Sequence, residues 1–275
     1  MSAFKGENDT ATWSHQQTFG QQNWPVKLAQ WIKQIGAQGT PCHVVYSIDW
    51  YQLLQVDRPQ VEAAEISQAL SWSIQDIIQT DKAQFIDYFD PPCQVAGADK
   101  VNVVAMPQEQ LTQLAKDILD CELDLQSIGI EELAICELLP VSDEAIITLV
   151  QEPGQEICLN IVKQGNLYFS RRLKGFENLA SFSESELQMG VVDSLCVQVQ
   201  RSMDYFDSQL RQAPVKRILI AVDSPVTEAL AKQIQQLVLI PVEPLSLSIT
   251  HAQDLNADAA SFISLGAALT RSAAS

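Results

Sequence analysis

The sequence predicts a mixed α/β protein of two lobes, residues 1–140 and 141–275. Two observations indicate this fold class. In the first half, short apolar runs alternate with amphipathic helices, in the order β-α-β-β-α-β-β-α-β-α. The second half opens with three short strands joined by tight turns, and a long helix and a β-α-β unit follow. Such a succession is half of a two-domain nucleotide-binding architecture.

The first lobe is predicted to carry a small inserted subdomain at about residues 50–130. Apolar residues at helical spacing mark its helices, as in WPVKLAQWIKQI, and short apolar runs that end at turn residues mark its strands. Residues 1–22 contain one weak strand. The predicted strands are residues 11–19, 42–48, 51–56, 85–89, 101–106 and 123–130, and the predicted helices are residues 23–35, 62–78, a helix that starts at Pro107, and residues 131–139.

The second lobe begins with the strand meander. Residues 145–150 are an apolar strand, residues 151–155 (QEPGQ) are a polar turn, and residues 157–162 alternate with the period of a strand. Ser183 and Glu186 form a capping box that starts the longest helix. The remaining predicted elements are strand 167–173, strand 217–222, helix 226–238, strand 240–244, loop 251–258 and helix 261–271, which we expect to return to the first lobe.

The composition excludes several classes of function. The formal net charge is −17 and the pI is about 4.4, so the surface repels nucleic acid and anionic membranes. A membrane is therefore expected to be reached only through partner proteins. The N-terminal residues MSAFKGENDT contain no apolar segment of the kind found in signal peptides, which predicts a cytoplasmic protein.

No residue pattern indicates a catalytic or metal site. The six cysteines are scattered without a CxxC pair, which predicts buried free thiols in a reducing compartment. The three histidines are far apart in the sequence, and His43 is predicted to pack within a strand rather than bind a metal ion. Asp87 and Asp90 are predicted to be solvated at a strand end rather than to act as an acid/base pair.

Five segments, in the right order, resemble a known family. They are VDRPQVEAAEISQALSWSIQDII (56–78), FIDYFDPP (85–92), KVNVVAMP (100–107), VKQGNLYFSRRLKGF (162–176) and QVQRSMDYFDSQLRQAP (198–214). Together they are similar to the MshI family, the PilM-like biogenesis proteins of the mannose-sensitive haemagglutinin (MSHA) type IV pilus. The resemblance covers about residues 40–271.

This resemblance implies an actin-like (FtsA/PilM-type) α/β fold of two lobes. It also implies a cytoplasmic platform under the inner membrane, where a groove of the first lobe takes the cytoplasmic tail of a PilN-like single-pass protein. Other pilus assembly proteins would be further partners. Tyr46, Ile66 and Trp72 are the residues that we expect to line such a groove, and ordinary core packing is the alternative for this region.

In ATP-binding proteins of the family that the sequence resembles, three loops bind the nucleotide. This sequence departs from the family pattern in all three loops. The first loop joins two N-terminal strands; that strand pair is missing from the prediction, so either the chain has lost it or its start lies downstream of the true one. The second loop holds an Asp and closely spaced glycines, where this chain has Gln151, Glu152 and Gly154 around Pro153. Proline has no N–H to donate, and glutamate adds negative charge near the phosphates.

The third loop is a Gly-Gly turn that packs against adenine and ribose, and here it reads DSP at 223–225. The sequence therefore predicts a scaffold without nucleotide, cofactor, metal or catalytic residues. The alternative is a slow ATPase that uses ATP and magnesium and whose nucleotide state gates partner binding. A sugar or acetate kinase of the same superfamily is disfavoured, because no acidic catalytic residue lies in a recognisable loop.

Overall fold

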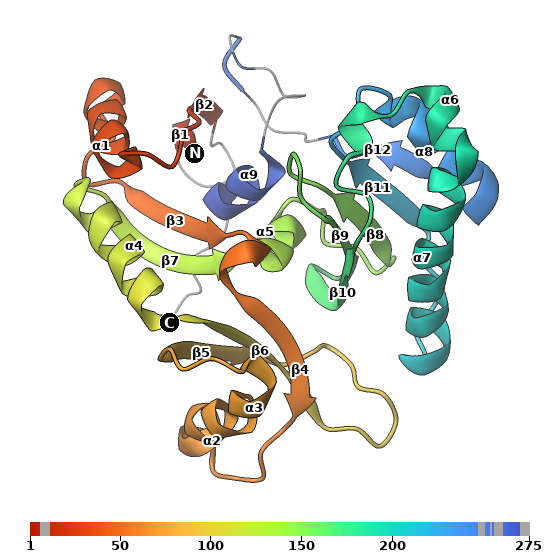
Figure 1. Cartoon of the computed structure of the whole chain (residues 1–275), viewed down its shortest axis with the longest axis horizontal. Helices are drawn as coiled ribbons and strands as arrows, with labels where there is room; N and C mark the ends of the chain where they lie inside the picture. Colours follow the sequence, from red (N-terminus) through yellow and green to blue (C-terminus); the bar gives the residue numbers. More distant parts are fainter. Residues whose placement is uncertain (6–11, 247–250, 254, 256–260, 270–275) are drawn as a thin grey trace. The chain divides into compact units, whose positions relative to one another are not determined.

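The computed structural model describes residues 1–5, 12–246, 251–253, 255 and 261–269. The chain divides into two compact units. Unit 1 comprises Met1–Pro91, Asp99–Leu138 and Ile249–Ser275, and unit 2 comprises Pro92–Ala98 and Leu139–Ser248. Figure 1 labels the helices and strands of both units. Within the described residues, no helix is long and apolar enough to pass through a bilayer.

Unit 1 begins with an antiparallel strand pair, β1 (Ser2–Lys5) and β2 (Thr12–Gln16). The prediction of one weak strand within residues 1–22, at residues 11–19, is corrected here, because this range holds two strands. A strand of only four residues carries too little alternation to be recognised by pattern. The connection between the two strands lies outside the described residues.

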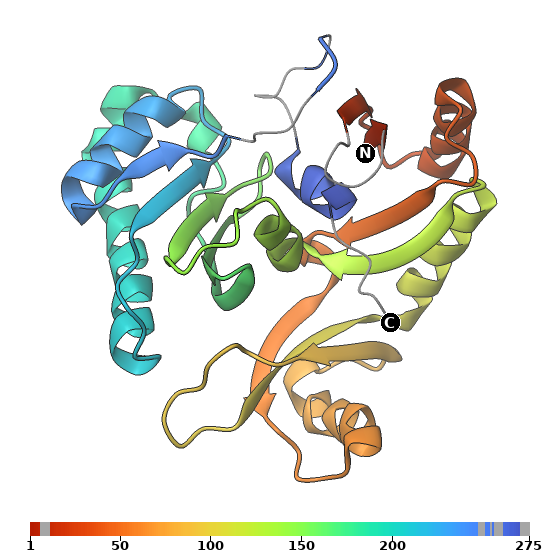
Figure 2. The same cartoon turned by 180° about the vertical axis from the view of Figure 1, so that it is seen from behind.

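The central part of unit 1 is a parallel pair of strands, with helices packed around it (Figures 1 and 2). One apolar cluster joins the two helices α1 and α4 to these strands. The helix α9 packs against α5, β3 and β1, so residues near the end of the chain complete this unit. The bounds are α1 (Trp24–Ile35), β3 (Pro41–Tyr46), α4 (Gln108–Asp120), β7 (Asp124–Ile130), α5 (Glu131–Glu137) and α9 (Phe262–Leu269).

A small subdomain is inserted between β3 and α4. Its antiparallel sheet has the order β4-β6-β5, with two short helices on one face. The helix predicted at residues 62–78 is divided at Ile74, a residue buried in the core of the subdomain that ends α2 and precedes α3. The bounds are β4 (Gln52–Asp57), α2 (Ile66–Ser73), α3 (Gln75–Ile78), β5 (Gln84–Phe89) and β6 (Lys100–Pro107).

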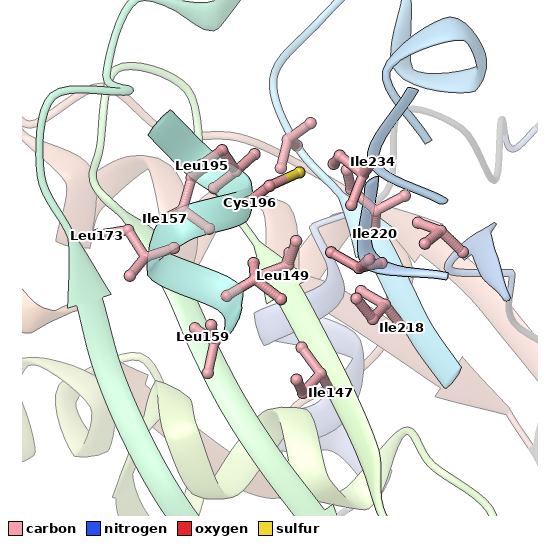
Figure 3. Packing of buried hydrophobic residues seen from close by; sticks show 14 of the residues in the cluster. Ile147, Leu149, Ile157, Leu159, Leu173, Leu195, Cys196, Ile218, Ile220 and Ile234 are labelled. Carbon is pink, nitrogen blue, oxygen red and sulfur yellow. The ribbon is translucent and has the colours of Figure 1, made fainter. Parts of the chain in front are cut away.

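Unit 2 is built on a five-stranded sheet of order β10-β9-β8-β11-β12. The three strands of the predicted meander are antiparallel, and β11 and β12 continue the sheet in parallel with β8. Alternate residues such as Leu149, Leu159 and Ile220 form the core (Figure 3). The bounds are β8 (Ile146–Val150), β9 (Ile157–Lys163), β10 (Asn166–Leu173), β11 (Arg217–Ala221), α8 (Thr227–Val238) and β12 (Val242–Pro244).

The long helix of unit 2 starts at the predicted capping box, where the Ser183 N–H donates to the Glu186 carboxylate over 2.8 Å. It is not continuous. Gly190 has a φ of 106° inside a π-helical turn, which separates the first turn from α7. Glycine tolerates this conformation, which residues with a Cβ rarely adopt. The segments are α6 (Glu184–Glu186), the π-helical turn Leu187–Val191, α7 (Val192–Asp204) and a second π-helical turn, Tyr205–Gln209.

Candidate functional site

The turn that follows β8 is organised by one side chain, that of Gln151, which is 7% exposed. Its Nε2 donates two hydrogen bonds, to the carbonyl oxygen of Gln155 over 2.7 Å and to that of Phe176 over 2.8 Å. Its Oε1 accepts the N–H of Asp223 over 3.2 Å. One buried amide therefore ties together the turn after β8, the segment after β10 and the turn after β11. We call this arrangement the Gln151 staple.

The backbone of the same turn offers few donors to a ligand. The Gln151 N–H is bonded to the Ala221 carbonyl over 2.8 Å, and the Gln155 N–H is bonded to the Glu152 carbonyl over 3.0 Å. Pro153 has no N–H. Three of the five residues of the predicted turn therefore have no N–H for a phosphate oxygen, and Gly154, with a φ of 75°, serves the turn itself. An anion-binding turn needs several converging N–H groups.

A pocket of about 680 Å³ lies beside the third of the predicted loops, within unit 2. Ser224 and Pro225 of that loop form part of its wall, and α8 supplies most of the rest. The charged side chains in the lining are two carboxylates, Glu184 and Glu228, and one ammonium group, Lys232. This balance disfavours a ligand that carries several negative charges.

Gln233 also lines this pocket. In the part of the chain that the structure describes, neither its Nε2 nor its Oε1 has a hydrogen-bond partner, although both atoms are buried. A buried amide without partners is unfavourable, so a bound group with one donor and one acceptor would satisfy it. The sequence analysis missed Gln233. No signal in the sequence singled it out, because it is one of several polar residues in TEALAKQIQQLV (227–238).

The structure does not bring the three predicted groove residues together. Ile66 is 8% exposed and lies in the core of the small subdomain, which is the core packing considered as the alternative. Trp72 lies on the same helix but is 70% exposed. Tyr46 ends β3, where its hydroxyl donates to the Gln110 carbonyl over 3.4 Å and its ring lies 6.4 Å from that of Trp50.

Three aromatic side chains of unit 1 that are exposed or half-buried are related to the apolar cluster on the second face of the three-stranded sheet. The buried residues of this cluster include Val104 and Met106, and Tyr46 packs against it. Phe85 pairs with Met106 across the strands and so shares its face, and it is 46% exposed. Trp50, beside Tyr46, is 44% exposed. We call Tyr46, Trp50 and Phe85 the aromatic surface.

The other titratable candidates are held in local structural contacts. His43 Nδ1 lies 2.7 Å from the Ser127 hydroxyl, and burial lowers the pKa of this histidine. The Asp87 carboxylate accepts the N–H of Tyr88, and Asp90 forms an ion pair with Arg58. The two aspartates thus have separate partners.

The cysteines are all free thiols, as predicted, and five of the six are buried. Burial raises the pKa of Cys42 to about 11 and that of Cys136 to about 12. Thiols with such pKa values are almost entirely protonated at neutral pH and are poor nucleophiles. Cys93 is the one that is half-buried.

Comparisons with known proteins give the fold. No family model and no curated protein sequence matches the chain. Among solved structures, a chain of the "PilM-PilN type IV pilus biogenesis complex" matches with a TM-score of 0.68 and 15% identity, over 98% of this chain and 94% of that one. The cytoplasmic domain of EpsL, an inner-membrane component of the type II secretion system of Vibrio cholerae, matches with a TM-score of 0.48, 13% identity, and coverage of 90% and 81%.

A Bacteroides thetaiotaomicron protein described as having an actin-like ATPase fold matches with a TM-score of 0.40 and 11% identity, over 79% of this chain and 69% of that one. The first match spans nearly the full length of both chains, so the conclusion about the fold rests on this match. The predicted mixed α/β fold is confirmed, and it is similar over nearly the whole chain to the fold of the matched chain of the PilM–PilN complex.

Proposed function

We propose that this chain is a PilM-like scaffold of a type IV pilus, which binds the cytoplasmic tail of a PilN-like inner-membrane protein and does not use a nucleotide. The observation that carries this proposal is the near full-length match to the PilM–PilN complex. The finer assignment, to the MshI family and the MSHA pilus, rests on the five sequence segments quoted above. The scaffold would lie on the cytoplasmic side and would reach the membrane only through its partners.

The aromatic surface is our candidate for the partner contact. Exposed aromatic side chains over a packed apolar base are the residues that most often dominate protein–protein binding. Trp50 and Phe85 expose nearly half of their surface, while Met106, the strand partner of Phe85, is buried. The formal net charge of −17 favours a basic tail and disfavours direct adsorption to anionic lipids.

The partner contact is tested with a fluorescent synthetic peptide that has the sequence of the cytoplasmic tail of a PilN-like protein. Replacing Trp50 or Phe85 by alanine is expected to weaken binding about tenfold or more, because each change removes a large apolar contact. Trp72→Ala is the matched control, since Trp72 is also exposed but lies on α2. If the wild-type chain does not bind the peptide, the scaffold proposal is wrong. If Trp72→Ala is the change that weakens binding, the partner does not bind at the aromatic surface.

The absence of nucleotide use is supported by the Gln151 staple, which occupies the turn where a phosphate would be held. We expect no saturation with a fluorescent ATP analogue and magnesium up to about 1 mM, a limit that corresponds to a binding free energy of about −4 kcal/mol. Saturation at micromolar concentration would overturn this expectation and would favour the ATPase alternative.

One observation favours the ATPase alternative, so the titration also tests the pocket for nucleotide binding. The pocket beside Ser224 contains the unpartnered amide of Gln233, and its wall includes the loop that packs against adenine in ATP-binding relatives. Adenosine is therefore titrated alongside the ATP analogue. Binding of both ligands, lost in Gln233→Leu, would assign the pocket to a nucleotide. Adenosine binding without ATP binding would agree with a closed phosphate turn.

A further inference from the structure

The strand β5, labelled in Figure 1, carries a carboxylate between two aromatic side chains. Successive residues of a strand point to opposite faces of a sheet, so Phe85, Asp87 and Phe89 share one face. It is the face opposite to the two short helices, because Asp87 pairs with Val104 of the apolar cluster there and Phe89 packs against the same cluster. Asp87 is exposed, and Phe85 is 46% exposed. The strand therefore presents one negative charge to solvent in a row of aromatic residues.

The charge of Asp87 is not paired with a cation within the part of the chain that the structure describes. Three other aspartates lie in or directly next to the three strands of this sheet, and each of them is in an ion pair. The pairs are Asp57 with Lys100, Asp90 with Arg58 and Asp99 with Arg58. The Asp87 carboxylate accepts one hydrogen bond, from the N–H of the neighbouring Tyr88 to Oδ1 over 2.8 Å. A carboxylate has about four acceptor positions, so Asp87 can bind a further donor group.

An arginine side chain suits this combination of groups. Its guanidinium is planar, donates two parallel hydrogen bonds to one carboxylate and stacks on aromatic rings, whereas lysine is a point charge without a flat face. A cation within about 6 Å of the centre of an aromatic ring is attracted by the ring face. Residues two apart along a strand are separated by about 7 Å. A guanidinium bound to Asp87 is therefore within reach of Phe85 or Phe89.

We propose that Asp87, flanked by Phe85 and Phe89, binds one arginine side chain of the peptide that docks on the aromatic surface. The inference rests on the function proposed above, because that peptide is the partner tail. The formal net charge of −17 attracts a basic tail without regard to its sequence. Asp87 adds specificity, because it fixes which residue of the tail lies beside Phe85.

The site is tested first with the fluorescent tail peptide described above. Asp87→Asn removes the charge but keeps an oxygen for the Tyr88 N–H, so the strand is expected to stay folded, which circular dichroism verifies. We expect this change to weaken binding about fivefold, the size of a favourable exposed ion pair. Asp76→Asn is the matched control, because Asp76 is also exposed but lies on α3, which packs on the other face of the sheet. The control is expected to change binding by less than about twofold.

A second probe makes the test independent of the natural tail. It is a fluorescent peptide of alternating leucine and arginine, compared with versions in which every arginine is replaced by lysine or by glutamine. We expect the arginine version to bind most tightly, and Asp87→Asn to weaken its binding about fivefold while Asp76→Asn does not. Equal binding of the arginine and lysine versions would overturn the assignment to arginine. Equal effects of the two substitutions would overturn the site.

The two probes separate this inference from the proposed function. A tail that binds the wild type and Asp87→Asn equally well would leave the scaffold proposal standing and overturn the arginine site. A tail that does not bind, beside an arginine peptide whose binding depends on Asp87, would overturn the scaffold proposal and support the site. Binding of neither peptide would contradict both.

Discussion

Replacing Gly266 by alanine is expected to lower the free energy of unfolding of unit 1 by about 3 kcal/mol, at the upper end for overpacked cores. Gly266 lies in α9, where this helix packs against α5. A Cβ atom at this position would lie 2.1 Å from the carbonyl oxygen of Ala134 and 2.7 Å from its carbonyl carbon. The obstacle is backbone, so α9 and α5 must move apart, and no side-chain rotation relieves the contact.

The chain supplies a selective probe for this experiment. All five tryptophans, the last being Trp72, lie in unit 1, so their fluorescence during urea unfolding reports on the unit that α9 completes. Gly129→Ala is the matched control. Its Cβ would meet only the Val44 carbonyl oxygen at 4.0 Å, an ordinary contact, and the change is expected to stay within about 1 kcal/mol. Equal shifts for both variants would show that the approach of α9 to α5 is not tight.

The sequence predicted most of the fold because the strongest patterns are local. The alternation through Ile157, Leu159 and Ile161 and the capping box at Ser183 each depend on neighbouring residues alone. The breaks at Ile74 and Gly190 were missed because amphipathic spacing continues across them. They are visible only in the backbone angles, such as the positive φ of Gly190, which have no strong signature in the periodicity.

The candidate sites were less accessible to prediction, because their members are distant in the chain. Pro153 already predicted a poor phosphate turn, but the role of Gln151 depends on Phe176 and Asp223, which only the fold places beside it. In the same way, Phe85 became part of an exposed surface only through its pairing with Met106. The return of residues 261–271 to the first lobe was expected, and the described helix α9 does pack in unit 1.

The Gln151 staple yields the second large effect, through Gln151→Glu. This change keeps the shape of the side chain but replaces two N–H donors by a carboxylate that faces the carbonyl oxygens of Gln155 and Phe176. A buried carboxylate that faces two carbonyl oxygens and keeps a single donor, the Asp223 N–H, is strongly unfavourable. We therefore expect a loss of about 3 kcal/mol at pH 7 in urea unfolding followed by circular dichroism. Gln155→Glu is the control. It makes the same change of charge in the same turn, at a side chain that is not part of the staple.

The pH dependence separates this mechanism from a general loss of packing. Burial next to carbonyl oxygens raises the pKa of the new carboxyl group in the folded chain above its value of about 4.3 in the unfolded chain. The protonated form then favours folding, so the deficit relative to wild type is smallest below about pH 4.3 and grows as pH rises through the folded pKa. A deficit that does not change with pH would point to packing alone. If Gln151→Glu were as stable as Gln155→Glu at neutral pH, the turn after β8 would not depend on the staple, and the case against a bound phosphate would lose its structural support.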